Sequence, residues 1–172
     1  MGYFPLCVDL NGKNVLLVGT GPQIGDKMEK LRPFGAVFLH CDDPTKLTLD
    51  DNTALVVVGD LGEGTAAEIS RRCRERRIPV NVVDDPKNST FCFPSLITRG
   101  DVTVSVSTGG KSPGGAAYLS RLISGMLPED TGEIIDRLHA LRTQLYADYP
   151  KEDAKLLLHE AVLQAFAPDA SR

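Results

Sequence analysis

The feature that most constrains the fold is a short apolar run that ends directly in a glycine turn. Residues 14–18 read Asn-Val-Leu-Leu-Val, and Gly19, Thr20 and Gly21 follow them. A continuous apolar run of this length is typical of a strand that is buried on both faces of a parallel sheet. A Gly-x-Gly turn between such a strand and a helix exposes backbone N–H groups to a phosphate. Because Ile24 replaces the third glycine of the dinucleotide motif, a nucleotide site and an ordinary tight turn both remain open.

Later segments repeat the alternation of strand and helix. Strands are expected at residues 36–40, 54–58 and 78–83, and helices at residues 27–34 and 65–77. Only about a dozen residues separate the second strand from the third, which is too few for a further helix and strand. This order of elements predicts an α/β unit of the Rossmann type with a mostly parallel sheet.

The second half of the chain begins with a short apolar stretch at residues 91–97. Valine alternates with serine and threonine over residues 101–108, which predicts a strand with one polar face, at an edge or beside a cleft. Ser112 followed by Pro113 is typical of a capped helix start. Beyond Pro128 only helices are expected; two of them cannot bury their apolar stripes alone, so they must pack on the α/β unit or on a second subunit. The stripes consist of Ile134, Leu138, Leu141 and Leu145, and of Ala154, Leu157, Leu158, Ala161 and Val162.

Composition and charge exclude several classes of protein. A net charge of −4 argues against sequence-independent binding of nucleic acid, and the basic run at residues 71–77 is expected to be the solvated face of a helix. No apolar run is long enough to span a bilayer, and the N-terminus resembles neither a signal peptide nor, with Leu6, a myristoylation site. A soluble cytoplasmic protein without membrane contact is therefore expected. The cysteines are widely spaced and predict reduced thiols.

Two acidic pairs follow predicted strands. Asp42 and Asp43 come about 20 residues after the glycine turn, where the dinucleotide motif places a carboxylate for ribose hydroxyls, and they favour NAD over NADP. Asp84 and Asp85 end a buried strand, at the edge where parallel sheets bind their ligands. A polar turn before the following proline would give the same pattern.

A second glycine-rich turn joins the strand at residues 101–108 to the next helix. It contains hydroxyls, backbone donors and Lys111, so it suits an anion or a carboxylate, although a simple helix cap explains it equally well. The histidines, His40, His139 and His159, have no metal-ligand spacing, so no metal site is expected. No nucleophile elbow or Cys-His signature supports covalent hydrolysis.

Five blocks of sequence, taken in order, resemble the siroheme synthase N-terminal family, the precorrin-2 dehydrogenases that often also act as sirohydrochlorin ferrochelatases. The Asn-Val-Val-Asp block at residues 81–84 and the Ser-Thr-Gly-Gly-x-Ser-Pro block at residues 107–113 are specific to that family. The resemblance covers most of residues 3–127, and the helical tail is similar to the family's dimerisation region. The blocks are residues 3–6 with Asp9 and Leu10, 15–21, 79–86, 91–94 and 107–113.

The resemblance implies a Rossmann-like domain over residues 1–127, which binds NAD and a tetrapyrrole, and a helical segment over residues 128–172 that forms a homodimer. It implies NAD-dependent oxidation of precorrin-2 to sirohydrochlorin, with ferrous iron as a second substrate for insertion in bifunctional members. The family's essential aspartate falls on Asp84, which is expected to act as a general base. The dinucleotide contacts fall on Gly19, Thr20, Gly21, Pro22, Gln23, Asp42 and Asp43. The tetrapyrrole contacts fall on Asn81, Ser107, Thr108, Gly109, Gly110 and Lys111, and Arg99 and Arg121 are further candidate donors to the substrate carboxylates.

Departures from the family pattern leave alternatives open. Thr20 interrupts the usual glycine triplet, Pro22 and Gly25 follow it, and residues 44–52 replace a helix and a strand. The lost strand would lie at the adenosine edge of the sheet, so weak NAD binding is expected. One alternative is a chelatase whose dinucleotide site has decayed. Another is a nucleotide-sensing or tetrapyrrole-carrying module without catalysis.

Overall fold

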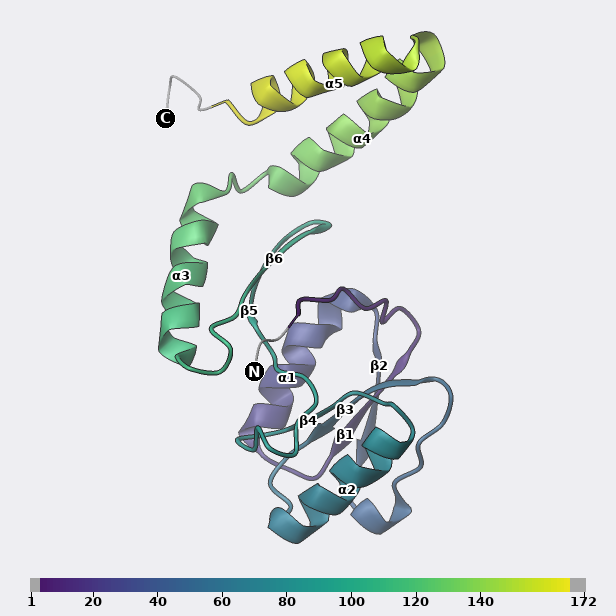
Figure 1. Cartoon of the computed structure of the whole chain (residues 1–172), viewed down its shortest axis with the longest axis vertical. Helices are drawn as coiled ribbons and strands as arrows, with labels where there is room; N and C mark the ends of the chain where they lie inside the picture. Colours follow the sequence, from purple (N-terminus) through teal and green to yellow (C-terminus); the bar gives the residue numbers. More distant parts are fainter. Residues whose placement is uncertain (1–3, 168–172) are drawn as a thin grey trace. The chain divides into compact units, whose positions relative to one another are not determined.

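The structure, a computed structural model, describes residues 4–167, which form two compact units (Figure 1). The first unit contains the described chain up to Pro94 together with Gly109–Lys111. The second unit contains Ser95–Thr108 and the described chain from Ser112 onward. Each unit has its own secondary structure and is described separately.

A parallel sheet forms the centre of the first unit. Its strands are β1 (Asn14–Val18), β2 (Val37–Cys41), β3 (Thr53–Val58) and β4 (Val80–Val82), in the order β2-β1-β3-β4. Every pairing is parallel, as the uninterrupted apolar runs predict. Because β2 lies on one side of β1 and β3 on the other, the chain changes direction across the sheet between β1 and β3. Open parallel sheets bind ligands beyond the carboxyl ends of their strands at such a point.

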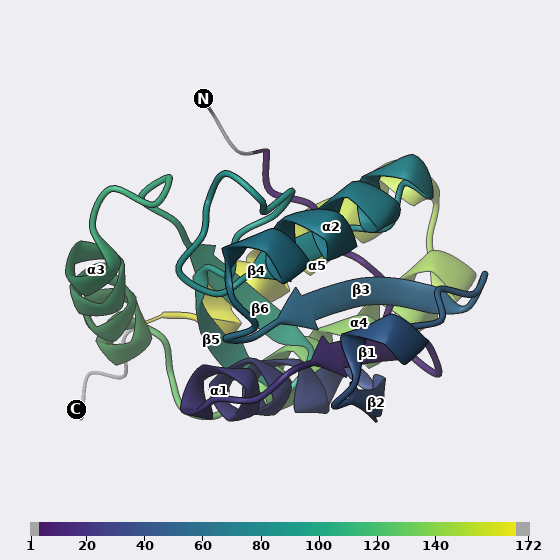
Figure 2. The ribbon, with the colours of Figure 1, turned by 90° about the horizontal axis from the view of Figure 1, so that it is seen from below.

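Helices cover both faces of this sheet (Figure 2). Leu17 of β1 lies in the apolar cluster under α1 (Pro22–Leu31), and Leu16 lies in the cluster under α2 (Glu63–Glu75). The predicted α/β fold is therefore confirmed. The helix predicted from residue 27 begins earlier, at Pro22, because a proline is well suited to the first helical position.

The connection between β2 and β3 contains only a short 3-10 turn, η2 (Pro44–Lys46), and neither a further helix nor a strand, as its length predicts. Leu47 and Leu49 are buried in the α2 cluster. Arg72 donates a hydrogen bond of 2.7 Å to the carbonyl of Leu47, and Arg76 donates one of 2.7 Å to the carbonyl of Leu49. Two arginines of the basic run thus fix this connection to α2, and β2 is an edge strand of the sheet.

The second unit combines a two-stranded sheet with helices. β5 (Ser95–Arg99) pairs antiparallel with β6 (Val102–Val106), and α3 (Pro113–Met126), α4 (Thr131–Asp148) and α5 (Lys151–Ala165) follow (Figure 1). The valines of β6 are half-buried and the polar residues between them are exposed, which confirms the predicted alternation. Within the described chain β6 pairs with β5 alone, so it is not a member of the parallel sheet.

The last two helices pack against each other. Ile134 and Leu145 on α4 and Ala154 on α5 are buried. Each helix lies on the other and α4 also contacts β6. The other residues of the predicted stripes are not buried, as expected for two helices that cannot cover their stripes alone; they are Leu138, Leu141, Leu157, Leu158, Ala161 and Val162. Leu156 and Leu163 on α5 remain 65% and 60% exposed.

The predicted domain boundary between residues 127 and 128 falls inside the second unit, which already includes β5 and β6. Tyr3 of the first sequence block and residues 168–172 of the predicted helical segment lie outside the described residues. Among residues 4–167, no helix combines the length and the apolar character needed to cross a membrane.

Candidate functional site

The turn after β1 needs its two glycines for different reasons. Gly19 has a φ of 84°, and a Cβ added to it would lie 2.6 Å from Cδ2 of Leu61, so this glycine allows the loop after β3 to pack on the turn. Gly21 has a φ of 126°, a conformation that other residues rarely adopt. A Cβ on Gly21 would meet only the side-chain oxygen of Gln23, at 3.3 Å. The space beside Gly21 is therefore open.

The open space lies at the N-terminus of α1. Gly21 is the N-cap residue and Pro22 follows at the first helical position. The first turn of α1 carries no acidic side chain, so the partial positive charge of the helix N-terminus is not neutralised there. The predicted dinucleotide contacts from Gly19 to Gln23 thus come together at a position that suits a phosphate group.

The carboxyl ends of β1 and β3 are joined beside this turn. Thr20 and Asp60 form an isolated antiparallel bridge, in which the N–H of Asp60 donates to the carbonyl of Thr20 at 3.2 Å. A Cβ on Gly59 would lie 2.4 Å from the same carbonyl oxygen, so only glycine fits there. Gly59, Asp60 and Leu61 were not among the predicted site residues. The signal for them was the Gly-Asp pair that closes the apolar run of β3.

The two aspartates after β2 differ in their surroundings. Asp43 accepts hydrogen bonds from the N–H of Thr45 at 3.1 Å and from its hydroxyl at 2.7 Å, and pairs with Lys46 at 3.4 Å. The Thr45 hydroxyl is the largest cause that lowers the pKa of Asp43. Asp42 is exposed, and within residues 4–167 its carboxylate makes no hydrogen bond or ion pair. Asp42 is thus the carboxylate that remains available to a ribose, whereas Asp43 caps η2.

A shallow hollow of about 330 Å³ lies beside Asp42. Its lining includes the apolar side chains of Leu16, Leu39 and Leu47, and Asp42 and Lys46 also border it. Leu39 is 43% exposed because β2 is an edge strand whose α2 face is covered only by the short connection to β3. The hollow offers an apolar surface next to a carboxylate without a hydrogen bond or ion pair in the described chain, a combination that would suit an adenosine group.

The two aspartates after β4 also differ. Asp85 accepts hydrogen bonds from the N–H groups of Lys87 at 3.1 Å and Asn88 at 3.2 Å, and from the Asn88 side chain at 2.6 Å. These hydrogen bonds lower the pKa of Asp85, and the bond from the Asn88 side chain is the largest cause. Asp84 has a φ of 56°, in the left-handed region, and its exposed carboxylate has no hydrogen bond or ion pair in the described chain.

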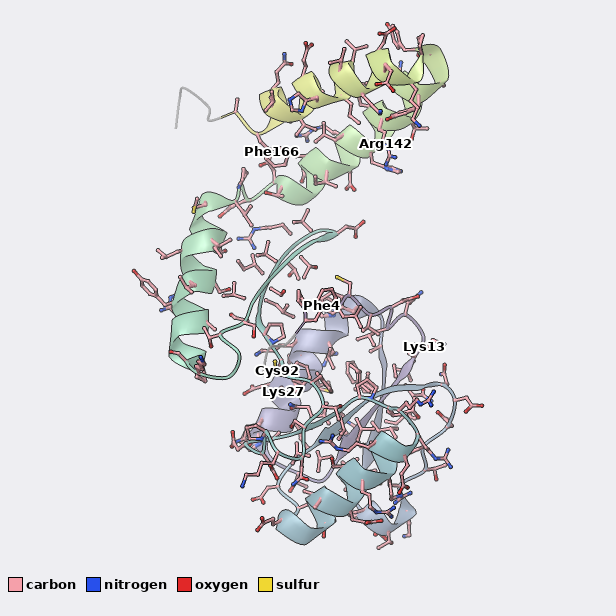
Figure 3. All side chains as sticks on the ribbon, viewed as in Figure 1. Phe4, Lys13, Lys27, Cys92, Arg142 and Phe166 are labelled. Atoms are coloured by element: carbon pink, nitrogen blue, oxygen red, sulfur yellow. The ribbon has the colours of Figure 1, made fainter. Side chains whose placement is uncertain are left out.

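The segment that follows Asp85 folds back along β4, where the N–H of Thr90 donates to the carbonyl of Val80 at 2.7 Å. The Asn81 side chain donates to the carbonyl of Phe91 at 3.1 Å, so this predicted substrate contact also fixes the chain at Phe91. The rings of Phe91 and Phe93 lie 5.1 Å apart. Lys27 on α1 lies beside this segment, with its ammonium 4.8 Å from the centre of the Phe93 ring (Figure 3). Lys27 was predicted to lie in a helix but was not among the predicted site residues.

The second glycine-rich turn is organised by its hydroxyls. Thr108 donates its hydroxyl to the carbonyl of Ser112 at 3.0 Å and accepts the N–H of Ser112 at 3.1 Å. The Ser112 hydroxyl accepts the N–H of Gly115, which confirms the predicted cap of α3. Gly109 and Gly110 have φ angles of 63° and 80°, which explains the glycine pair. Its predicted role as an anion site stays a prediction.

Other candidate groups are placed as follows. Arg99 donates to the hydroxyl of Ser124 at 3.1 Å, and Arg121 lies 5.9 Å from the ring centre of Tyr118, all within the second unit.

In the described part of the chain no group of three or more His, Cys, Asp or Glu side chains is placed to hold a metal ion. The cysteines at positions 7, 41, 73 and 92 form no disulfide, as their spacing predicts.

Comparisons with known proteins find similar sequences and a similar fold. A family model described as putative NAD(P)-binding matches residues 40–95. The chain is 30% identical to the siroheme synthase of Gluconobacter oxydans over 99% of its own length and 41% of that protein. It is 32% identical to the siroheme synthase of Tolumonas auensis over 84% of its length and 35% of that protein. The chain thus spans about two fifths of the length of these relatives.

A solved structure described as "SirC, precorrin-2 dehydrogenase" has a similar fold. Its TM-score is 0.68, and the alignment covers 92% of this chain and 88% of the other. The sequence identity is 17%, so this likeness concerns the fold alone. The α/β unit with its parallel sheet and the helices that follow it is therefore a shared architecture.

Proposed function

The chain belongs to the siroheme synthase N-terminal family, and from this premise we propose that it is a precorrin-2 dehydrogenase that uses NAD. The observation that carries the proposal is the exposure and backbone conformation of Asp84. Its carboxylate is exposed and makes no hydrogen bond or ion pair in the described chain, and its left-handed backbone follows the carboxyl end of the parallel strand β4. A residue other than glycine in this conformation costs about 1–3 kcal/mol, and such strain concentrates at functional sites.

The nucleotide turn fits the phosphates of NAD. Gly21 leaves open space at a helix N-terminus whose first turn has no acidic side chain. Asp42 offers a free carboxylate for ribose hydroxyls next to the apolar hollow. When bound, NAD would supply the acceptor for a hydride. The residues that would bind it are Gly19, Thr20, Gly21, Pro22, Gln23 and Asp42.

Asp84 would act as the general base. Oxidation of precorrin-2 breaks two bonds to hydrogen, and the substrate loses one hydride and one proton. The hydride carries both electrons to the dinucleotide, so the proton must go to a base, and the carboxylate of Asp84 is free to accept it. Asp85 is a poor candidate, because three donors already occupy its oxygens. The tetrapyrrole contacts that the family resemblance assigns to residues 107–111 stay predictions.

A chelatase is the second candidate, and the same observation favours it. Insertion of ferrous iron into sirohydrochlorin releases two pyrrole N–H protons, and a free carboxylate such as Asp84 can accept them one at a time, passing the first to water before it takes the second. This reaction needs no dinucleotide. Because β2 is an edge strand, NAD binding is expected to be weak, and that weakness would not impair a chelatase without dehydrogenase activity.

Absorbance tests the proposal directly. The purified chain is mixed with precorrin-2 and NAD, and the build-up of NADH and sirohydrochlorin is followed. Equal amounts of both products are expected. Iron insertion into added sirohydrochlorin without any NADH from precorrin-2 would leave only the chelatase.

A further inference from the structure

Lys27 differs from the other lysines of the first unit in its surroundings. Its side chain is half-buried on α1, and its ammonium lies 4.8 Å from the centre of the Phe93 ring. In the part of the chain that the structure describes, Lys27 forms no ion pair within 4.0 Å, whereas Lys46 pairs with Asp43. Within residues 4–167, Lys27 is thus a partly desolvated cation that forms no direct ion pair.

Charged groups around Lys27 come from two elements. Asp26 and Lys30 lie on α1 itself, and Asp84 lies on the segment after β4. Burial is the largest cause that lowers the pKa of Lys27, and Lys30 lowers it further, whereas Asp26 and Asp84 raise it. Asp84 thus belongs, with Asp26 and Lys30, to the charged groups that influence the Lys27 ammonium.

We propose that Lys27 is a substrate-binding residue, whose ammonium binds a carboxylate of the tetrapyrrole and thereby brings the reacting carbon of the substrate to Asp84. This inference rests on the proposed function, since the substrate of that reaction is a polycarboxylate. A cation that is partly removed from water binds a carboxylate more strongly than an exposed lysine does. The ring of Phe93 stabilises the cation without occupying its N–H donors with a carboxylate. These donors therefore remain available to an acidic ligand.

The experiment compares substitutions on α1 in the full chain. Lys27→Met removes the charge and keeps the length of the side chain, and Lys27→Arg keeps the charge. Lys30→Met is the matched control, because Lys30 lies on the same helix, is exposed and contacts neither Phe93 nor a carboxylate in the described chain. Binding of sirohydrochlorin is measured by absorbance titration and binding of NAD by calorimetry. The KM and kcat of the dehydrogenase reaction are measured separately.

Lys27→Met should weaken binding of sirohydrochlorin and raise KM for precorrin-2 by about tenfold, because a charge-assisted hydrogen bond is lost. The dependence of binding on salt should also become weaker, since one ionic contact is gone. Lys27→Arg should restore most of the affinity. The affinity for NAD should not change, and Lys30→Met should behave like the parent chain.

The failures are distinguishable. If the parent chain binds no sirohydrochlorin, the proposed function is wrong. If it binds sirohydrochlorin and Lys27→Met binds it equally well, only the role of Lys27 is wrong. A loss of NAD affinity in Lys27→Met, with unchanged tetrapyrrole affinity, would also overturn that role, because Lys27 would then serve a phosphate. Lys27→Gln repeats the test with a polar side chain should the methionine variant fold poorly.

Discussion

Asp84 and Asp85 are neighbours in the chain, yet in the part that the structure describes only the Asp85 carboxylate accepts hydrogen bonds. Asp85 accepts two backbone N–H groups and the side chain of Asn88, and so fixes the turn after β4. Asp84 adopts a left-handed conformation in that turn, and within residues 4–167 its carboxylate has no hydrogen bond or ion pair. The hydrogen bonds of Asp85 therefore fix the turn in which the Asp84 carboxylate is exposed.

This division of roles predicts opposite outcomes for two matched substitutions. Asp84→Asn should lower kcat for precorrin-2 oxidation by about 10²–10⁴-fold, the usual contribution of a general base, with an unchanged melting temperature. Asp85→Asn should lower the melting temperature and retain more of the activity. Activity assays and thermal melts of both variants test this. Near-normal turnover by Asp84→Asn would contradict the general-base role and leave Asp84 as a turn residue.

The bonds of Asp85 also predict a pH dependence of stability. Its pKa in the folded protein is lowered, so its bonds stabilise the fold above the unfolded-state pKa of about 3.9, and this stabilisation is lost as the pH falls through the folded-state pKa. The urea midpoint of Asp85→Ala should therefore lie below that of the parent chain at neutral pH. The gap should close in acid. A gap that stays constant with pH would show that the charge of Asp85 does not contribute.

Two glycines on either side of the start of α1 give a test of the nucleotide turn. Gly21→Ala forces a side chain onto a φ of 126°, so the turn must change shape and NAD affinity should fall at least about tenfold; Gly21→Val, whose branched side chain would enter the path of the pyrophosphate, should abolish binding. Gly25→Ala is the control, since a Cβ there meets no atom within 4 Å. It should stabilise the protein by about 0.5–1 kcal/mol, because alanine favours a helix. Calorimetry and urea unfolding measure both effects. Equal NAD affinity in Gly21→Ala would exclude the turn as the phosphate site.

Periodicity and local motifs sufficed to predict the parallel sheet, the absence of a helix between β2 and β3, and the turn at Gly19. Apolar runs and glycine turns are local sequence patterns. They predict the observed elements well because the apolar runs become the buried strands of the core. The start of α1 was predicted too late, because Pro22 looked like a departure from a motif and not like a helix start.

The site residues that the sequence analysis missed depend on contacts between distant segments. Leu61 matters because its side chain lies over Gly19, and Lys27 matters because Phe93 lies beside it. Neither pair has a sequence spacing that could reveal it. The different roles of Asp84 and Asp85 were also hidden, since both residues have the same chemistry and only the turn geometry separates them.

The adenosine side of the nucleotide site gives a further matched pair. Asp42→Ala removes the free carboxylate and should weaken NAD binding about ten- to a hundredfold, as expected for a lost hydrogen bond to a charged group. Asp43→Ala removes the cap of η2 and should affect NAD less. Because β2 is an edge strand, NAD binding by the parent chain should itself be weak. Calorimetric titration of the parent chain and both variants tests this, and equal losses in the two variants would contradict the assignment of the ribose to Asp42.

The exposed leucines of α5 predict that the chain forms a homodimer. Ile134, Leu145 and Ala154 are already buried, whereas Leu156 and Leu163, two helical turns apart, are 65% and 60% exposed. Burial of a leucine side chain contributes about 1.5–3 kcal/mol. A dimer in which a second copy covers both leucines would therefore be more stable than the separate chains. Light scattering should give twice the chain mass of 18.6 kDa. The double substitution Leu156→Glu with Leu163→Glu should give the single mass with its helix content retained, whereas Gln164→Glu, an exposed polar control on the same helix, should stay dimeric. A monomeric parent chain at micromolar concentration would refute the prediction. It would show that Leu156 and Leu163 stay exposed to solvent and do not contact a second copy.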